Sequence, residues 1–166
     1  MATEPDLHSC FPPVANARTR LVVLGSLPGI ASLAAGRYYA HPRNQFWPLI
    51  GAAIGRELAP ISYEARLEAL LDAGVGLWDT VAAATRRGSL DADIRLRAAS
   101  DLPGLVGTLP ELRVIAFNGG TSARIGRREL AGTTGFALVD LPSSSPAYTL
   151  PFAAKRETWL QLHAYL

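Results

Sequence analysis

The chain has 166 residues, 49% of them hydrophobic and 18% charged, a composition typical of a folded globular protein, which excludes a disordered chain. The formal net charge of +2 indicates only a mild preference for nucleic acid. Cys10 is the single cysteine, which excludes an intramolecular disulfide, a cysteine-ligated iron–sulfur cluster and a cysteine-rich zinc site.

Residues 1–19 lack hydrophobic periodicity and contain three prolines, so we expect an irregular leader that wraps the surface of a single domain spanning 1–166. Acids and prolines stand where a signal peptide would have a basic patch and an apolar run. No stretch approaches eighteen apolar residues, so no membrane partner is expected. We therefore expect a cytoplasmic protein, and a monomer.

The first predicted strand is the apolar run 21–24, which ends at Gly25 and is typical of a strand buried on both faces. Residues 26–45 show no helical period, and a long irregular stretch of this kind usually carries function. The apolar spacing then predicts helices over 46–54 and 63–73.

Residues 74–78 are predicted to form a short strand, with Asp79 capping a turn of helix through Ala84. The following residues are predicted to form a loop (86–89), a helix (102–109), a strand (114–117), a helix (121–130), a strand (136–141), a loop (142–151) and a closing helix that carries Trp159.

Strands that alternate with helices predict an α/β fold, a three-layer α/β/α sandwich with a central, mostly parallel sheet. Ligands of such sheets bind at the carboxyl ends of the strands. The least regular loops, at 25–45, 118–120 and 142–150, all follow strands. We therefore expect these three loops to meet at one edge of the sheet.

The densest cluster of polar and aromatic residues is His41–Trp47, at the predicted start of a helix. Its amides are suited to positioning a water and a base edge, and its rings to stacking on a flipped base. A purely structural interpretation stays open, because Asn44 is also a good helix N-cap and Phe46 and Trp47 fit a core.

Other chemistries find less support. Gly25–Gly29 lacks the spacing and the lysine of a phosphate-binding loop, which disfavours a nucleotide cofactor. The three histidines lie far apart, so neither a metal nor any other cofactor is expected. The acids Asp79, Asp91 and Asp93 are interpreted as caps or turn residues. Arg86 and Arg87, which precede Ser89, fit either a phosphate contact or an exposed basic turn.

Lysine is almost absent, since fifteen of the sixteen basic residues are arginines and Lys155 is the exception. Arginine binds phosphate bidentately, which suits a nucleic-acid partner. The coding bias of a GC-rich genome explains the same excess equally well. Schiff-base catalysis would rest on Lys155 alone.

Six segments, in this order, resemble the hypoxanthine-DNA glycosylase family of the uracil-DNA glycosylase superfamily, from about Leu21 to the C-terminus. They are Gly25–Gly29, Tyr38–Trp47, Gly76–Asp79, Arg87–Asp91, Phe117–Gly119 and Leu141–Ala147. The segment 41–47 is also similar to one in mismatch-specific uracil glycosylases. The best-known uracil enzymes carry Asp or Asn where this chain has Ser26, a departure that argues against efficient uracil removal.

The resemblance implies that Asn44 is the principal catalytic residue, with Gln45 assisting it. It implies that Asn118 hydrogen-bonds the extruded base and that Phe46 stacks on it, with Gly25 and Ser26 also at the base. The remaining expected contacts are to DNA, from Pro28, Gly29, His41, Arg43, Ser143, Ser144, Ser145 and Pro146. The segment 143–147 resembles the one that pinches the DNA backbone and fills the gap left by base flipping.

The predicted function is a monofunctional DNA glycosylase acting on DNA that contains a deaminated base, most simply hypoxanthine in deoxyinosine, and leaving an abasic site. Neutral amides suit this chemistry, because they can orient a water and stabilise the departing base without acting as strong bases. Two alternatives stay open: a uracil- or xanthine-directed glycosylase of the same superfamily, and a non-catalytic nucleic-acid-binding module in which Asn44 only caps a helix.

Overall fold

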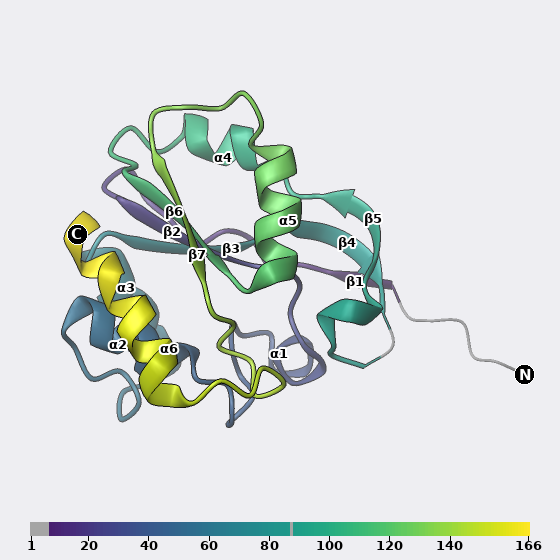
Figure 1. Cartoon of the computed structure of the whole chain (residues 1–166), viewed down its shortest axis with the longest axis horizontal. Helices are drawn as coiled ribbons and strands as arrows, with labels where there is room; N and C mark the ends of the chain where they lie inside the picture. Colours follow the sequence, from purple (N-terminus) through teal and green to yellow (C-terminus); the bar gives the residue numbers. More distant parts are fainter. Residues whose placement is uncertain (1–6, 87) are drawn as a thin grey trace, which may run out of the picture.

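A four-stranded parallel sheet forms the centre of the computed structural model, which describes residues 7–86 and 88–166 (Figure 1). The spatial order is β3-β2-β6-β7, and every neighbouring pair runs parallel. The bounds are Leu21–Gly25 for β2, Val75–Asp79 for β3, Val114–Asn118 for β6 and Ala137–Leu141 for β7. All four strands lie within one residue of their predicted positions, and the predicted parallel sheet is confirmed.

Helices cover both faces of this sheet, which makes the predicted three-layer sandwich (Figure 1). One face carries α2 (Phe46–Ile54), α3 (Tyr63–Asp72) and α6 (Phe152–Trp159), and the other carries α4 (Leu102–Gly107) and α5 (Gly120–Glu129). Along β2, Leu21 and Val23 are buried in the core on the α2 side, whereas Val22 and Leu24 are buried in the core on the α5 side. Burial on both faces is why the strand is an unbroken apolar run.

The segment 26–45 was expected to hold no helix, and this prediction is wrong in part. A short helix, α1 (Ile30–Ala35), follows Gly29 and ends at Gly36, whose φ of 63° is left-handed. Its residues are adequate helix formers, but six of them give too short a window for a periodic signal.

A second, antiparallel sheet of three strands was not predicted. It has the order β1-β4-β5, with β1 at Leu7–Ser9, β4 at Val81–Thr85 and β5 at Arg95–Ala99. The expected helical turn from Asp79 to Ala84 is therefore wrong. Alanine favours helix locally, and here pairing with β1 and β5, which are distant in sequence, overrides that preference.

The leader predicted over 1–19 is likewise not irregular throughout, since β1 pairs with β4 and Val14 bridges to Leu77. Residues 1–6 and Arg87 lie outside the described residues. The chain closes with α6 and a 3₁₀ segment, η2 (Leu160–Tyr165). Trp159 of α6 is fully buried and its indole N–H donates to the carbonyl oxygen of Pro142 at 3.0 Å.

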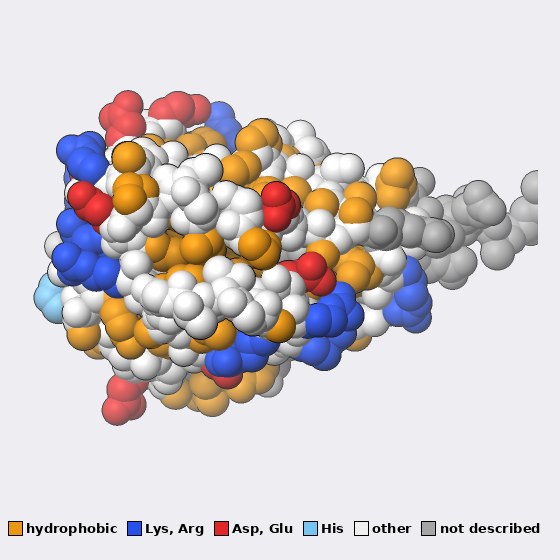
Figure 2. Space-filling view, turned by 90° about the horizontal axis from the view of Figure 1, so that it is seen from above, with side chains coloured by type: hydrophobic (Ala, Val, Ile, Leu, Met, Phe, Trp, Pro, Cys, Tyr) orange, Lys and Arg blue, Asp and Glu red, His pale blue; other side chains and the backbone are white. Residues whose placement is uncertain are grey.

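The surface gives no simple functional signal. On the face shown in Figure 2, basic and acidic side chains lie interspersed rather than in one patch of a single sign. Within residues 7–86 and 88–166, the helices are all too short or too polar to cross a membrane. Any functional argument therefore depends on a specific site rather than on overall charge.

Gly126→Ala is expected to destabilise the fold. A Cβ at Gly126 in α5 would lie 2.3 Å from the ring of Phe117, a fully buried residue of β6 that cannot easily move. Overpacking of this kind costs about 1–3 kcal/mol. Thermal melting should show a midpoint lower by roughly 2–4 °C per kcal/mol lost.

Gly120→Ala in the same helix is the matched control, because a Cβ there would meet no described atom within 4 Å. Its melting temperature should stay equal or rise slightly. Equal melting temperatures for the two variants would contradict the packing argument.

Candidate active site

A cavity of about 460 Å³ opens at the carboxyl edge of the parallel sheet. Its walls come from the segments after β2 and β7, from the loop before α2, from residues 89–91, and from the last residues of β2, β3 and β6. Each of the three irregular loops contributes lining residues, so their predicted convergence is confirmed. Ligands of open parallel sheets bind outside these strand ends, which makes this cavity the candidate site.

Most of the predicted site residues line this cavity. They are Gly25, Ser26, Pro28, Gly29, His41, Arg43, Asn44, Asn118, Ser143, Ser144, Ser145 and Pro146. Gln45 and Phe46 do not, although the sequence places them beside Asn44.

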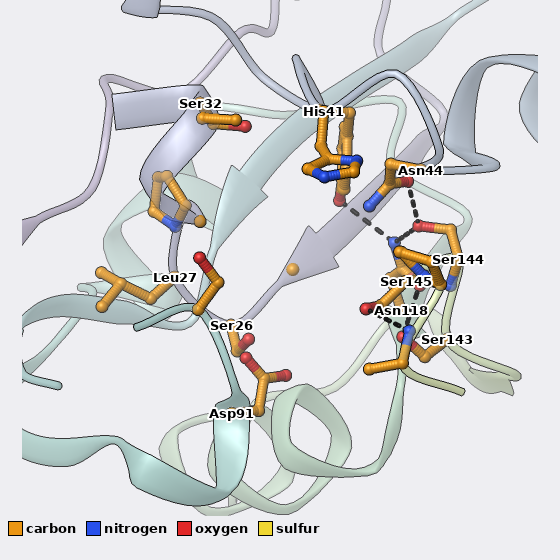
Figure 3. Close-up of a pocket in the computed structure, with 18 of the residues that line it drawn as sticks. Ser26, Leu27, Ser32, His41, Asn44, Asp91, Asn118, Ser143, Ser144 and Ser145 are labelled. Carbon is orange, nitrogen blue, oxygen red and sulfur yellow. Dashed lines mark hydrogen bonds between the residues drawn. The ribbon is translucent and has the colours of Figure 1, made fainter. Parts of the chain in front are cut away.

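A chain of hydrogen bonds joins Asn44 to Asn118 through Ser144 (Figure 3). The Ser144 hydroxyl donates to Asn44 Oδ1 at 2.8 Å and accepts from Asn118 Nδ2 at 2.9 Å. The Ser144 backbone N–H donates to Asn118 Oδ1, also at 2.9 Å. These bonds fix the orientation of both amides, and Ser144 itself is 1% exposed.

Asn44 both contacts the helix start and faces the cavity. Its Oδ1 accepts from the backbone N–H of Phe46 at 3.0 Å, in addition to the Ser144 hydroxyl. The helix boundary places Gln45 at the N-cap position, where its side chain makes no capping bond. Asn44 therefore supports the first turn of α2 and presents its amide to the cavity, so the capping and functional interpretations are compatible.

Gln45 and Phe46 serve the surrounding structure. The backbone N–H of Gln45 donates to the Ser144 carbonyl at 3.0 Å, while its Oε1 is buried with no described donor. Phe46 is fully buried, and Tyr39 stacks on its ring with centroids 3.8 Å apart and planes at 15°. The expected stacking of a base on Phe46 is therefore blocked here by Tyr39, whose ring lines the cavity.

Tyr39 reaches the centre of the cavity. Its hydroxyl accepts from Asn118 Nδ2 at 3.3 Å, a longer bond than the one from the same nitrogen to Ser144. Its backbone has a φ of 52°, which is unusual for a bulky residue. Burial is the main cause that raises the pKa of its phenol, which keeps this hydroxyl neutral.

An ionisable cluster on the opposite side of the cavity was missed by the sequence interpretation. Asp79 ends β3 and is 4% exposed, Arg86 follows β4 and is 2% exposed, and Asp91 lies on the 3₁₀ segment η1 (Asp91–Asp93). Figure 3 shows Asp91 beside Ser26, away from Asn44. Arg86 is thus neither an exposed turn residue nor placed to hold an external phosphate.

The register of the sheet could have revealed Asp79, because it pairs directly with Gly25 at the carboxyl ends of β3 and β2. A Cβ at Gly25 would lie 2.5 Å from Asp79 Oδ1 and 3.1 Å from the Tyr39 hydroxyl. Only glycine leaves room for both groups. Ser89 lies in the segment between β4 and η1. Its hydroxyl accepts from the backbone N–H of Ile30 at 2.9 Å, which ties this segment to α1.

The pKa of Asp79 is raised to about 7, mainly by burial and also by the nearby Asp91 carboxylate, against the attraction of the Arg86 guanidinium. Burial also raises the pKa of Asp91, against hydrogen bonding by Ser26 and attraction by Arg86. The closest Arg86–Asp91 approach is 4.0 Å, from Nη1 to Oδ1. The cavity thus combines a wall of neutral amides with a wall that can hold or release a proton near neutral pH.

Lys155 lies outside the cavity lining. It is 1% exposed, and its Nζ donates to the backbone carbonyl of Ser145 at 3.2 Å, from behind the loop 143–147. Desolvation lowers the pKa of this amine. Its observed contact is a support for the loop rather than a nucleophile facing the site.

Comparison with known proteins gives consistent matches. The sequence profile of the Uracil DNA glycosylase superfamily matches residues 12–165. A hypoxanthine DNA glycosylase of Methanosarcina barkeri is 36% identical over 151 residues, covering 91% of this chain and 94% of the relative. A hypoxanthine DNA glycosylase of Methanosarcina acetivorans is 40% identical over 149 residues, covering 89% and 92%.

The fold is similar to a solved structure as well. The solution NMR structure of a candidate uracil DNA glycosylase from Methanosarcina acetivorans superimposes with a TM-score of 0.86 at 35% sequence identity. The similarity covers 96% of this chain and 99% of the other.

The raised pKa of Asp79 predicts a pH-dependent stability. Its pKa is about 7 in the folded chain and 3.8 ordinarily, so the folded state binds more protons between these values. The contribution of Asp79 to the free energy of unfolding is therefore fully present below about pH 4 and lost as the pH rises to about 7. Asp79→Asn should flatten this decline.

Thermal melts of both proteins at pH 5 and pH 8 check the sign. The variant should gain stability relative to the natural protein by several degrees more at pH 8 than at pH 5. Parallel shifts at the two pH values would contradict the raised pKa.

Proposed function

The chain belongs to the uracil DNA glycosylase superfamily, and from that membership and the geometry of its cavity we propose that it is a monofunctional DNA glycosylase that releases hypoxanthine from deoxyinosine and leaves an abasic site. The observation that carries the proposal is the hydrogen-bonded pair of asparagines, Asn44 and Asn118, held by Ser144 at the carboxyl edge of the sheet. The names of the two Methanosarcina relatives support hypoxanthine as the base.

The two amides match the charges that develop as the N-glycosidic bond breaks. Positive charge grows on the deoxyribose and negative charge on the departing base, so fixed dipoles at both positions lower the barrier. Asn118 Nδ2 is directed toward the base, and its long bond to Tyr39 can be replaced by a stronger one to a base acceptor. Asn44 is placed to orient the water that attacks C1′.

Asn44 can accept from that water only under one condition. Its Oδ1 already accepts two hydrogen bonds, from Phe46 N–H and from the Ser144 hydroxyl. A carbonyl oxygen has two lone pairs, so the water must take the place of the Ser144 hydroxyl. Ser144 would then act as a positioning residue that keeps Asn44 correctly oriented until substrate arrives.

The aromatic contact and the DNA contacts follow from the same geometry. Tyr39 is proposed to meet the flipped base, with Phe46 supporting it from below. The loop 143–147 is held in shape by its own serines: the Ser143 hydroxyl accepts from Ser145 N–H at 3.1 Å, and the Ser145 hydroxyl accepts from Ala147 N–H at 3.2 Å. A preformed loop suits the proposed contact with the DNA backbone.

The absence of strand cleavage is proposed because Lys155, the only lysine, is buried behind that loop. Release of uracil or xanthine is the second candidate activity, which membership of the superfamily favours and Ser26 in the first motif disfavours for uracil. A monomeric state and a cytoplasmic location stay predictions.

The activity is tested with labelled oligonucleotides that contain a single deoxyinosine, deoxyuridine or deoxyxanthosine. After incubation with purified protein, the expected result is cleavage at deoxyinosine only when hot alkali follows, because alkali breaks an abasic site. Cleavage without alkali would show strand scission by the protein. Intact oligonucleotides in every lane would refute the catalytic proposal and leave the binding-module interpretation.

Asn44→Ala is expected to lower the single-turnover rate of base release by at least about 10²-fold, the scale of losing one preorganised group in an active site. Binding to the same oligonucleotide should change little. The variant also loses the bond to Phe46 N–H, which costs about 1 kcal/mol of stability.

Ser62→Ala is the matched control for that stability loss. Ser62 caps α3 by accepting from Ala65 N–H at 3.2 Å, outside the cavity lining. Both variants should melt at similarly reduced temperatures, and only Asn44→Ala should lose activity. An Asn44→Ala protein as active as Ser62→Ala would show that Asn44 merely caps the helix.

A further inference from the structure

Asp79 is the feature of the cavity that the amide mechanism leaves unused. It lines the cavity at the end of β3, and its Oδ1 lies against the backbone of Gly25, where even a methyl group would clash. Its Oδ2 is buried, and among the described residues no group donates to it. A carboxyl group with one oxygen buried away from any donor is more stable protonated than ionised.

The charges around Asp79 favour the same state. Two carboxyl groups, those of Asp79 and Asp91, share the vicinity of one guanidinium, that of Arg86. Arg86 forms its ion pair with Asp91, with Nη1 and Oδ1 4.0 Å apart, and its Nη2 donates to the carbonyl oxygen of Pro28. Asp79 is therefore left as the carboxyl group that holds the proton, at a pKa of about 7.

Apart from Asp91, which is paired with Arg86, the titratable groups near Asp79 do not compete for this proton near neutral pH. Tyr38 and Tyr39 face it from the loop before α2, and Cys10 from the N-terminal segment; burial is the main cause that raises the pKa of all three. They stay neutral in the range where Asp79 titrates, and Arg86 stays charged.

We propose that Asp79, in its protonated form, is the general acid that protonates the departing purine. This inference rests on the proposed function. As the C1′–N9 bond breaks, its electron pair passes to the base, and the Asp79 proton moves to an acceptor nitrogen of the ring, N7 or N3. Neutral hypoxanthine leaves, and water adds its hydroxide to C1′ while its remaining proton restores the Asp79 carboxylic acid.

This step supplies what the amides cannot. An asparagine can donate a hydrogen bond to a developing negative charge but cannot transfer a proton to it. Hypoxanthine offers two unprotonated ring nitrogens besides N9, whereas the ring of uracil leaves only carbonyl oxygens as acceptors. A carboxylic acid in the cavity therefore favours a purine as the leaving group.

The test is the single-turnover rate of hypoxanthine release from a deoxyinosine oligonucleotide between pH 5.5 and pH 9, for the natural protein and for D79N. General acid catalysis contributes about 10²–10⁴-fold, so D79N should lose at least about 10²-fold at pH 6. The rate of the natural protein should fall about tenfold per pH unit above about pH 7, while the rate of D79N stays flat. D140N, which removes a carboxylate in an exposed ion pair with Arg127, should match the natural protein.

Substrates that lack one ring nitrogen locate the proton acceptor, and the pH profile of the natural protein on them is informative even without a variant. With 7-deaza- or 3-deaza-deoxyinosine, a C–H replaces the nitrogen. For the analogue that lacks the true acceptor, the natural protein should lose its decline above pH 7, and D79N should be no slower than the natural protein.

Three outcomes would overturn the proposal. The first is a D79N rate within about threefold of the natural rate at pH 6. The second is a rate of D79N that is lower than the natural rate by the same factor at every pH. The third is a rate of D79N that is lower than the natural rate by the same factor on both deaza substrates. In each case deoxyinosine is still cleaved by the natural protein, so the glycosylase function stands. No release of any base by the natural protein would instead remove the proposed function and this inference together.

Discussion

The interaction on which the site depends is the pair of hydrogen bonds made by the Ser144 hydroxyl to Asn44 and Asn118. These residues come from three separate segments, and Ser144 is 100 positions from Asn44 and 26 from Asn118. Asn44 also accepts from the Phe46 N–H and Asn118 also donates to the Tyr39 hydroxyl, but the Ser144 hydroxyl is the contact that couples the two amides. Ser144 thus joins the loop before α2, the end of β6 and the loop after β7 into one polar wall.

The polar wall of Asn44, Ser144 and Asn118 is held rigid by the aromatic packing around Phe46 and by contacts from α6 to the loop that carries Ser144. Phe46 packs edge-on against Trp47 and Trp159, and the Trp159 indole N–H donates to the carbonyl of Pro142 at the start of the loop that carries Ser144. Lys155 holds the same loop from its backbone at Ser145. Preorganised dipoles lower a barrier only if they do not have to reorient during the reaction, and buried aromatic packing provides that restraint.

The second sheet has a different role. Figure 3 shows Asp91, which follows β4 in the chain, on the side of the cavity away from Asn44. Arg86 pairs with Asp91 from beneath the lining, and the carboxyl groups of Asp79 and Asp91 form a wall that can exchange a proton. One cavity thus combines fixed neutral dipoles with a carboxyl group whose pKa lies near neutrality. Hydrolysis of a glycosidic bond to a purine benefits from both, since charge develops on the sugar and on the base at once.

Much of this architecture was predictable from the sequence because it depends on local patterns. Buried parallel strands are continuous apolar runs, so β2, β3, β6 and β7 could be located to within a residue, and amphipathic spacing located α2 and α3. The rule that loops after parallel strands share an edge brought residues 25–45, 118–120 and 142–150 together. The same rule placed Asn44 and Asn118 near each other.

Tertiary structure alone decided the rest. The strand β4 is an alanine-rich segment that looks helical until its partners from residues 7–9 and 95–99 are known. The sequence predicted Phe46 as the stacking ring, and only packing shows that Tyr39 covers it. Asp79 looks like a cap residue, yet its burial against Gly25 and the charges of Asp91 and Arg86 set its protonation. Periodicity records which side chains are buried, whereas ionisation and exposure at a site depend on neighbours far away in the chain.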